Sequence, residues 1–203
     1  LQSGTTYYYR IRASSAVDEV FSSPMFFNTQ LTEPQLSTNS ITSISVNSSL
    51  SGGNVIHDGG SPVTERGVVW HTLPNPTIDD HVGKTISGSG NGDFSSDLVS
   101  LSPQTTYYVR AYAINSIGIS YGNELSFTTL GHAPIVSSQQ AIILSANSLD
   151  LRGLVNPGHL STIVYFDYGL TSAYGTTVVA TQSPITGSTN TVVSVEISGL
   201  EVL

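Results

Sequence analysis

Two stretches of nearly identical sequence decide the fold of this chain: LQSGTTYYYR at residues 1–10 and LSPQTTYYVR at residues 101–110. The likeness continues downstream at the same offset of 100 residues, through the pairs Ala13 and Ala113, Phe21 and Tyr121, Phe27 and Phe127, and Thr29 and Thr129. A third copy begins at Ser198, where Leu200 takes the place of Leu101. A period of about 100 residues is the length of a small domain, so we expect a tandem array that is out of phase with its own ends.

The composition favours small all-β domains. The 203 residues suffice for two domains of this period, each large enough to bury a core without a metal or a disulfide. Charged residues make up only 10% of the chain, compared with roughly a quarter in typical proteins. Ser, Thr, Asn and Gly take their place, and this mixture is poor in helix formers and rich in residues of strands and turns.

Charge and cysteine content exclude several classes of function. The formal net charge is −8 and the chain has 6 Lys and Arg residues, which argues against binding to nucleic acid or to an anionic membrane surface. No apolar run is long enough to span a bilayer, so we expect no membrane insertion in this segment. Without cysteine the chain has no disulfide, thiol nucleophile or thiolate metal site.

Alternating apolar residues predict strands. In Thr105–Asn115 one face carries the odd-numbered residues, Tyr107, Val109, Ala111 and Ala113, while Arg110 marks the solvent face. This strand is expected to form a hairpin with Ser120–Thr129, and its twin is the pair Thr5–Ala13 and Phe21–Thr29.

Other short strands are predicted between turns rich in Gly and Pro, with a break after Leu50 at Ser51-Gly52-Gly53. They lie at Ile41–Val46, Val63–Trp70, Val82–Ile86, Phe94–Val99, Ser148–Val155, Thr162–Tyr168, Thr176–Thr181 and Thr191–Ile197. Many short strands without a helical stretch predict an all-β fold of antiparallel sandwiches.

The residues resemble one family. The pattern Leu101-x-Pro103-x-Thr105-x-Tyr107-x-Val109-x-Ala111-x-Ala113-x-Asn115, followed by Gly118 and Ser120, is similar to strand F and its preceding corner in fibronectin type III domains. Val63–Trp70, Asn75-Pro76-Thr77 and Tyr121-Gly122-Asn123-Glu124 resemble the divergent repeats of large bacterial secreted and surface proteins. The stretch from residue 131 onward resembles a sister type, through Val155-Asn156-Pro157-Gly158 and Tyr165-Phe166-Asp167-Tyr168-Gly169.

The resemblance implies tandem immunoglobulin-like, fibronectin type III-like β-sandwiches and a structural corner at the start of strand F. There a Tyr hydroxyl bonds back to upstream backbone, which assigns this role to Tyr107 and Tyr7. Pro103 fixes the backbone just before it, and Leu101 fills the core beneath. The first copy departs from the pattern at Ser3 and Ser15, which stand where Pro103 and Asn115 stand in the second.

The array divides into three parts by this resemblance. Residues 1–30 correspond to the C-terminal strands F and G of one domain, residues 33–130 to a complete domain, and residues 131–203 to the N-terminal strands A–E of another. Three explanations of the odd phase stand open. The chain is a window on a longer array, or residues 1–30 of one copy complete residues 131–203 of the next, or the chain is a fragment that folds only in part.

No residue pattern points to catalysis, so we expect no enzyme. None of the five His residues has metal-ligand spacing to another, and the Gly-x-Ser-x-Gly pattern of serine hydrolases is missing. Gly88–Gly92 lacks the Lys and the helix of a phosphate loop. No cofactor is expected. Asp79-Asp80-His81 and Asp93 leave a calcium site open as a minor hypothesis, although the ion needs six to eight oxygens from several segments.

Aromatic residues supply the candidate binding surface. Trp70, Tyr108 and Tyr112 are taken as an exposed surface for a glycan or protein ligand, with both tyrosines projecting outward from strand F. The alternative is that outward aromatics pack on neighbours across the sheet. Trp70 discriminates between the two, because a buried indole belongs to the core and an exposed one suggests stacking on sugar.

The resemblance implies non-enzymatic spacer repeats of an extracellular bacterial cell-surface protein, such as an adhesin stalk or fibre. Its partners are then neighbouring repeats, joined by linkers Gln30–Pro34 and Leu130–Pro134 that proline stiffens. Three alternatives remain: a filament subunit in a homopolymer formed by strand exchange, a glycan- or protein-binding module, and an accessory spacer of a larger secreted enzyme.

Overall fold

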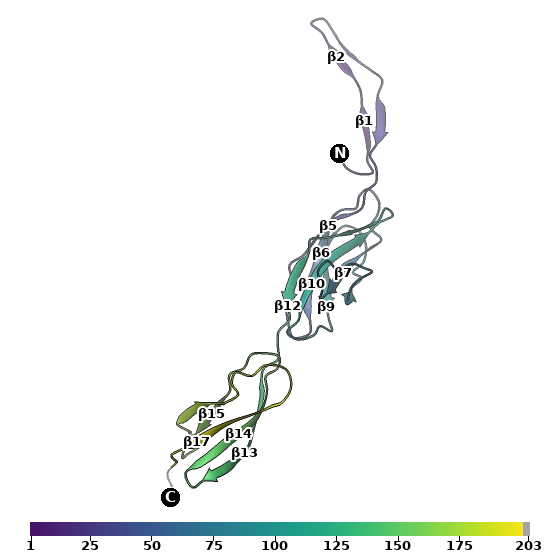
Figure 1. The fold of residues 1–203 in the computed structure, drawn as a ribbon. Coiled ribbons are helices and arrows are strands. Elements are labelled where there is room, and N and C mark those ends of the chain that lie inside the picture. The colour runs from purple at the N-terminus through teal and green to yellow at the C-terminus, as the bar shows by residue number, and fades with distance from the viewer. Residues whose placement is uncertain (201–203) are drawn as a thin grey trace. The chain divides into compact units, whose positions relative to one another are not determined.

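The structure is a computed structural model that describes residues 1–200, and its regular elements are all strands (Figure 1). The contacts divide the chain into two compact units. The first comprises residues 1–101 with 105–129, and the second comprises residues 102–104 with the chain from Leu130 onward. No helix in the described part of the chain could serve as a membrane span.

A complete sandwich of two antiparallel sheets is formed by residues 33–129, here called the middle sandwich. One sheet has the order β5 (Gln35–Thr38), β6 (Ser49–His57), β9 (Gly92–Leu98). The other has the order β8 (Gly83–Lys84), β7 (Glu65–His71), β10 (Thr106–Ile114), with β11 (Ile119–Tyr121) and β12 (Leu125–Thr128) both paired to β10. This arrangement is an immunoglobulin-like, fibronectin type III-like sandwich and confirms the predicted fold class.

The core of the middle sandwich lies between these sheets, as the alternation in β10 predicts. Tyr107, Val109, Ala111 and Ala113 all face inward and are buried, together with Leu101 at the preceding corner. Burying a large apolar side chain stabilises a fold by roughly 1.5–3 kcal/mol. The core therefore accounts for the stability of a domain that has no disulfide.

The predicted break at Ser51-Gly52-Gly53 is wrong, because β6 runs through these residues. A Cβ on Gly53 would lie 2.6 Å from the Cβ of Ala111, so glycine is needed where β6 faces β10 of the other sheet. A Cβ on Gly52 would lie 2.0 Å from the carbonyl oxygen of Phe94 on the neighbouring β9. The two glycines allow backbone contact inside a strand and do not form a turn.

The strand predicted at Ile41–Val46 is also wrong. The first strand of the middle sandwich, β5, ends at Thr38, and the segment predicted as a strand forms a loop with one bridge, from Thr42 to Leu50. Ile41 and Ile44 still pack against the core, which explains their apolar spacing.

The predicted strand Ser120–Thr129 divides into β11 and β12 at Gly122, where the end of β5 reaches the second sheet. Thr38 makes both contacts there. Its hydroxyl oxygen accepts a hydrogen bond from the amide of Ala111, and its own amide donates to Asn123 Oδ1. One strand end thus bridges the two sheets.

The first thirty residues form a two-part hairpin with the same pairing as β10 and its partners. Strand β1 (Thr6–Tyr9) pairs with β4 (Met25–Asn28), and β2 (Arg12–Ser14) pairs with β3 (Glu19–Phe21). Tyr7 lies opposite Phe27 just as Tyr107 lies opposite Phe127. The two ring pairs stack in the same way, with centroids 5.7 Å and 5.9 Å apart.

The second unit has one sheet of three strands and one sheet of two strands. The order is β13 (Ile135–Ser145), β14 (Ser148–Asn156), β17 (Thr191–Ser198) in one sheet, and β15 (Tyr165–Tyr168) pairs with β16 (Thr176–Val179) in the other. A small core lies between them, formed by Val155, Val164, Phe166, Ala180, Ile185 and Val193. Sequence reasoning missed β13.

Gly52→Ala is expected to destabilise the middle sandwich by about 3 kcal/mol, because the new methyl group would meet the Phe94 carbonyl and force two strands apart. Gly118→Ala is the matched control, since its methyl group would meet only the movable carboxylate of Glu33. Urea unfolding followed by Trp70, the single tryptophan, reports on this sandwich. Equal midpoints for both variants would contradict this account of Gly52.

Candidate functional site

Trp70 is a core residue, so its proposed place on a binding surface is wrong. The side chain is 6% exposed and packs in the middle sandwich. Trp70 faces inward with Val68 because both lie on the same side of β7. Gly83 of β8 lies against the indole, where an added Cβ would come within 2.1 Å of Cζ2. No face of the ring remains for stacking on a sugar.

Tyr112 does not form a binding surface either, although the alternation correctly places it on the outer side of the second sheet. Its register partner on β7 is Gly67, and a Cβ there would lie 2.9 Å from Tyr112 Cε1. The ring therefore lies across a strand position without a side chain, and Tyr112 is 0% exposed. Sequence alternation could not show that β8 and the residues after it cover this ring.

A polar cluster surrounds the Tyr112 hydroxyl. The hydroxyl oxygen lies 2.7 Å from Glu65 Oε1 and 2.8 Å from the carbonyl oxygen of Thr85, so its proton serves two acceptors. The Lys84 ammonium lies 2.9 Å from the same Glu65 oxygen and 5.1 Å from the Tyr112 ring centroid. The cluster joins three strands, β7, β8 and β10, on the outer side of the sheet.

The electrostatics of this cluster favour a charged Glu65 and a neutral Tyr112. Hydrogen bonds from Lys84 and Tyr112 hold the pKa of Glu65 below its usual range. Burial, reinforced by the neighbouring Glu65 carboxylate, raises the pKa of the Tyr112 hydroxyl far above its usual range. Both shifts favour a neutral hydroxyl that donates to a charged carboxylate, and this hydrogen bond joins neighbouring strands of the sheet.

Tyr108 is the one partly accessible residue of the predicted surface. It lies opposite His71 of β7 and Ser126 of β12, on the same outer side of the sheet as Tyr112. Since Trp70 and Tyr112 are buried on opposite sides of that sheet, the three residues do not form a common surface.

The contact predicted for the structural corner is present in the first copy. In the first copy the Tyr7 hydroxyl accepts a hydrogen bond of 2.7 Å from the backbone amide of Gln2. In the second copy Tyr107 is buried, and Leu101 fills the core while its amide donates to the carbonyl of Asn47. Pro103, half-buried, lies between Leu101 and the start of β10.

The carboxylates considered for calcium do not converge. Asp79, Asp80 and Asp93 are all exposed, and Asp80 lies 3.7 Å from His71 Nε2. Within residues 1–200 no group of three or more His, Asp or Glu residues could hold a metal ion.

A linker clamp, formed by Asn115 and its partners, is the polar site that sequence reasoning missed. The buried amide nitrogen of Asn115 donates to the carbonyl oxygens of Thr32 and Asp58, at 2.7 Å and 2.8 Å. Its side-chain oxygen accepts from the amides of Ile117 and Gly118. One side chain thus joins the incoming linker, the turn after β6 and the turn after β10. In the sequence, the only indication of this role is that Asn115 belongs to the pattern shared with strand F of fibronectin type III domains.

Tyr112→Phe is expected to lower the free energy of unfolding of the middle sandwich by about 1–3 kcal/mol, because the Thr85 carbonyl and Glu65 both lose the hydrogen bond from this hydroxyl and Glu65 keeps only Lys84. Tyr108→Phe removes a hydroxyl from a half-buried ring on the same face, and the change in unfolding free energy should stay within about 0.5 kcal/mol. Urea unfolding with Trp70 fluorescence measures both. An equally small change for Tyr112→Phe would show that the polar cluster contributes little to the stability of the middle sandwich.

Glu65→Gln is expected to reduce the pH dependence of the free energy of unfolding in the acidic range. Because the pKa of Glu65 is lowered in the folded state, its contribution is complete above about pH 4.5 and is lost as the pH falls through the lowered pKa. The gap in unfolding free energy between wild type and Glu65→Gln should therefore shrink from about pH 7 to about pH 3. A gap that stays constant over this range would refute the assignment.

No family model and no curated protein sequence matches the chain. Among solved structures, it is similar to the sensor domain of the anti-sigma factor RsgI4 of Pseudobacteroides cellulosolvens, at 17% identity and a TM-score of 0.36, over 49% of this chain and 96% of that one. It is also similar to domains A168-A170 from titin, at 16% identity and a TM-score of 0.36, over 61% of this chain and 40% of that one. The FN1-FN3 domains of chicken CNTN1 match at 15% identity and a TM-score of 0.39, over 98% of this chain and 69% of that one. At these values the likenesses carry no functional argument, and the fold assignment rests on the chain's own sheets.

Proposed function

We propose that this chain is a non-enzymatic spacer: a run of fibronectin type III-like repeats in an extracellular bacterial surface protein, of the adhesin stalk or fibre type. The observation that carries the proposal is the path of the chain through the middle sandwich. It enters at one end of the strands and leaves at the other.

The pairing registers give this path. Gln35, where β5 begins, lies opposite His57, the last residue of β6. Leu98, where β9 ends, lies opposite Ser49 at the start of β6. From there the chain passes to Thr106, whose partner is Thr128 at the end of β12. The entry and exit are therefore separated by the length of β6, nine residues or roughly 30 Å.

Hydrogen bonds between each linker and the domain that follows it support the role of a stalk over that of a flexible tether. At the entrance, the amide of Thr32 donates to the carbonyl of Gly59, and the linker clamp binds the carbonyl of the same residue. In the second unit, the amide of His132 donates in the same way to the carbonyl of Gly158. Each linker is thus tied to the turn of the domain that it precedes. Pro34 and Pro134 then limit the remaining backbone freedom.

The cellular setting comes from composition and from the family resemblance. A chain without cysteine, low in charge and rich in Ser, Thr, Asn and Gly is consistent with a bacterial protein exposed outside the cell. The buried positions of Trp70 and Tyr112 weaken the alternative of a glycan-binding module. An accessory spacer in a larger secreted enzyme would need the same separation of chain entry and exit. It would differ only in holding a catalytic domain in place of an adhesive one.

The spacer function predicts a narrow distance distribution across the second linker. Because the chain has no cysteine, spin labels can be placed at Ser95→Cys and Ser138→Cys, two exposed positions on either side of Leu130–Pro134. Pulsed electron resonance should give one narrow distribution, and Pro134→Gly should broaden it. The control, Pro74→Gly, changes an exposed loop proline outside the linker and should leave the width unchanged. A wild-type distribution as broad as that of Pro134→Gly would rule out a stiff spacer.

A further inference from the structure

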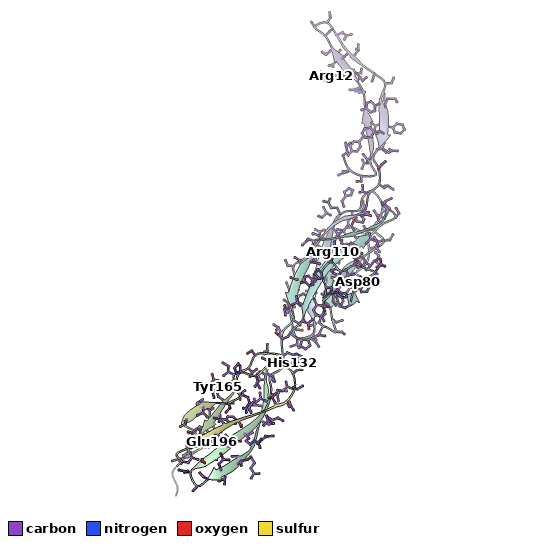
Figure 2. All side chains as sticks on the ribbon, in the orientation of Figure 1. Arg12, Asp80, Arg110, His132, Tyr165 and Glu196 are labelled. Carbon is purple, nitrogen blue, oxygen red and sulfur yellow. The ribbon has the colours of Figure 1, made fainter. Side chains whose placement is uncertain are left out.

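The two linkers of the chain are held by the same kind of backbone contact. The amide of Thr32 donates to the carbonyl of Gly59, in the turn after β6. The amide of His132, labelled in Figure 2, donates to the carbonyl of Gly158, in the turn after β14. A Cβ on Gly59 would lie 2.0 Å from the carbonyl oxygen of Thr32, and one on Gly158 would lie 2.4 Å from that of His132. In both units the linker backbone therefore lies directly on a glycine of the turn.

The side chain that shapes this turn differs between the two units. It belongs to the last residue of the central strand, which is His57 in β6 and Asn156 in β14. His57 Nδ1 accepts a hydrogen bond of 2.8 Å from the amide of Gly59. Asn156 Oδ1 accepts one of 3.0 Å from the amide of Gly158. The two residues are equivalent in register as well, because each lies opposite the first residue of the preceding strand, β5 or β13.

His57 and Asn156 differ in one chemical respect, because only the imidazole can gain a proton. A ring nitrogen that accepts a hydrogen bond carries no proton, so His57 is neutral in this geometry and has its proton on Nε2. A second proton on Nδ1 would turn the acceptor into a donor and set two N–H groups against each other. The amide oxygen of Asn156 remains an acceptor over the range in which histidine titrates.

The charged groups around His57 attract a protonated ring. The side chain is 36% exposed, so protons from solvent reach it, and Asp58 Oδ1 in the same turn lies 3.8 Å from Nδ1. Glu33 of the linker lines the same hollow of about 220 Å³ as His57. Gln35 of β5 and residues 1–3 also line it and add no ionisable side chain. Both carboxylates would therefore draw an imidazolium away from the amide of Gly59.

A change in this turn reaches both attachments of the first linker. The carbonyl of Gly59 binds the amide of Thr32, and the linker clamp joins the carbonyl of Thr32 to the carbonyl of Asp58 through Asn115. The groups of the turn that hold the linker thus belong to the two residues directly after His57. Displacing the amide of Gly59 would move both of them.

We propose that protonation of His57 releases the first linker from its turn, so that the joint before the middle sandwich loosens in acid while the joint before the second unit stays fixed. Histidine changes charge between about pH 5 and about pH 8, and the joint responds over that range. The inference rests on the proposed spacer function, because stiffness matters in a joint that holds domains apart. The chain is then a spacer with one pH-sensitive joint and one insensitive joint.

The test measures each linker separately in the full chain by pulsed electron resonance. Tyr8→Cys with Ser95→Cys places spin labels at exposed positions on either side of the first linker. Ser95→Cys with Ser138→Cys does so for the second linker. Between about pH 8 and about pH 5, the first distance distribution should lose its narrow peak and the second should keep it. Fluorescence of the buried Trp70 at both pH values checks that the middle sandwich stays folded.

His57→Asn gives the first linker the acceptor that the second linker already has. Its distance distribution should stay narrow at both pH values, because the amide oxygen cannot be protonated in this range. His71→Asn is the matched control. His71 Nδ1 accepts a hydrogen bond of 2.8 Å from the amide of Leu73 at the end of β7, in the loop that leads to β8. The first linker of this variant should still broaden in acid.

A first linker that stays narrow at both pH values in the wild type would overturn the switch and leave the spacer function standing. Acid broadening that persists in His57→Asn, or that is equal in both linkers, would also overturn the switch. Distributions that are already broad at about pH 8 would contradict the spacer function and the switch together.

Discussion

The close approach of Gly53 and Ala111 is the constraint on which the middle sandwich depends. No side chain fits at Gly53, since even a Cβ would lie 2.6 Å from Ala111 and 2.8 Å from Phe94 Cζ. Because the Ala111 methyl group of β10 packs directly over Gly53 of β6, larger residues such as Val55 and Val109 fill the rest of the core and exclude water. Sheet spacing and core packing both follow from this contact.

The same contact explains why the other two parts of the chain differ from the middle sandwich. The N-terminal hairpin has the strands that belong on the β10 side but, within its own residues, nothing equivalent to β6. The second unit has β14, with Gly153 in the place of Gly53, but nothing equivalent to Ala111. Each part keeps its local pairing and turns, which depend on near neighbours in sequence, and each leaves apolar side chains exposed. The hairpin and the second unit thus repeat the local strand pairing of the middle sandwich, but they do not repeat its core.

Sequence reasoning succeeded where one local pattern decides the outcome. The alternation of Thr105–Asn115 predicts both β10 and its inward face, and the repeat of this stretch predicts the N-terminal hairpin. It failed where distant residues decide. Gly52 and Gly53 resemble a turn until β9 and β10 lie against them, and Tyr112 resembles a surface residue until β8 covers it. The linker clamp could not be predicted because Thr32 and Asp58 are far from Asn115 in sequence.

The opposite placement of the chain's entry and exit has a consequence for load. A pull on both ends of the middle sandwich acts along the strands, whereas antiparallel backbone hydrogen bonds run across them. The bonds that join β5 to β6 and β10 to β12 would then be sheared together and not opened one after another. Resistance is shared over every bond of a strand pair at once, which suits a domain that must transmit tension. Thr38, which joins the end of β5 to Ala111 and Asn123 of the opposite sheet, would carry part of that tension from one sheet to the other.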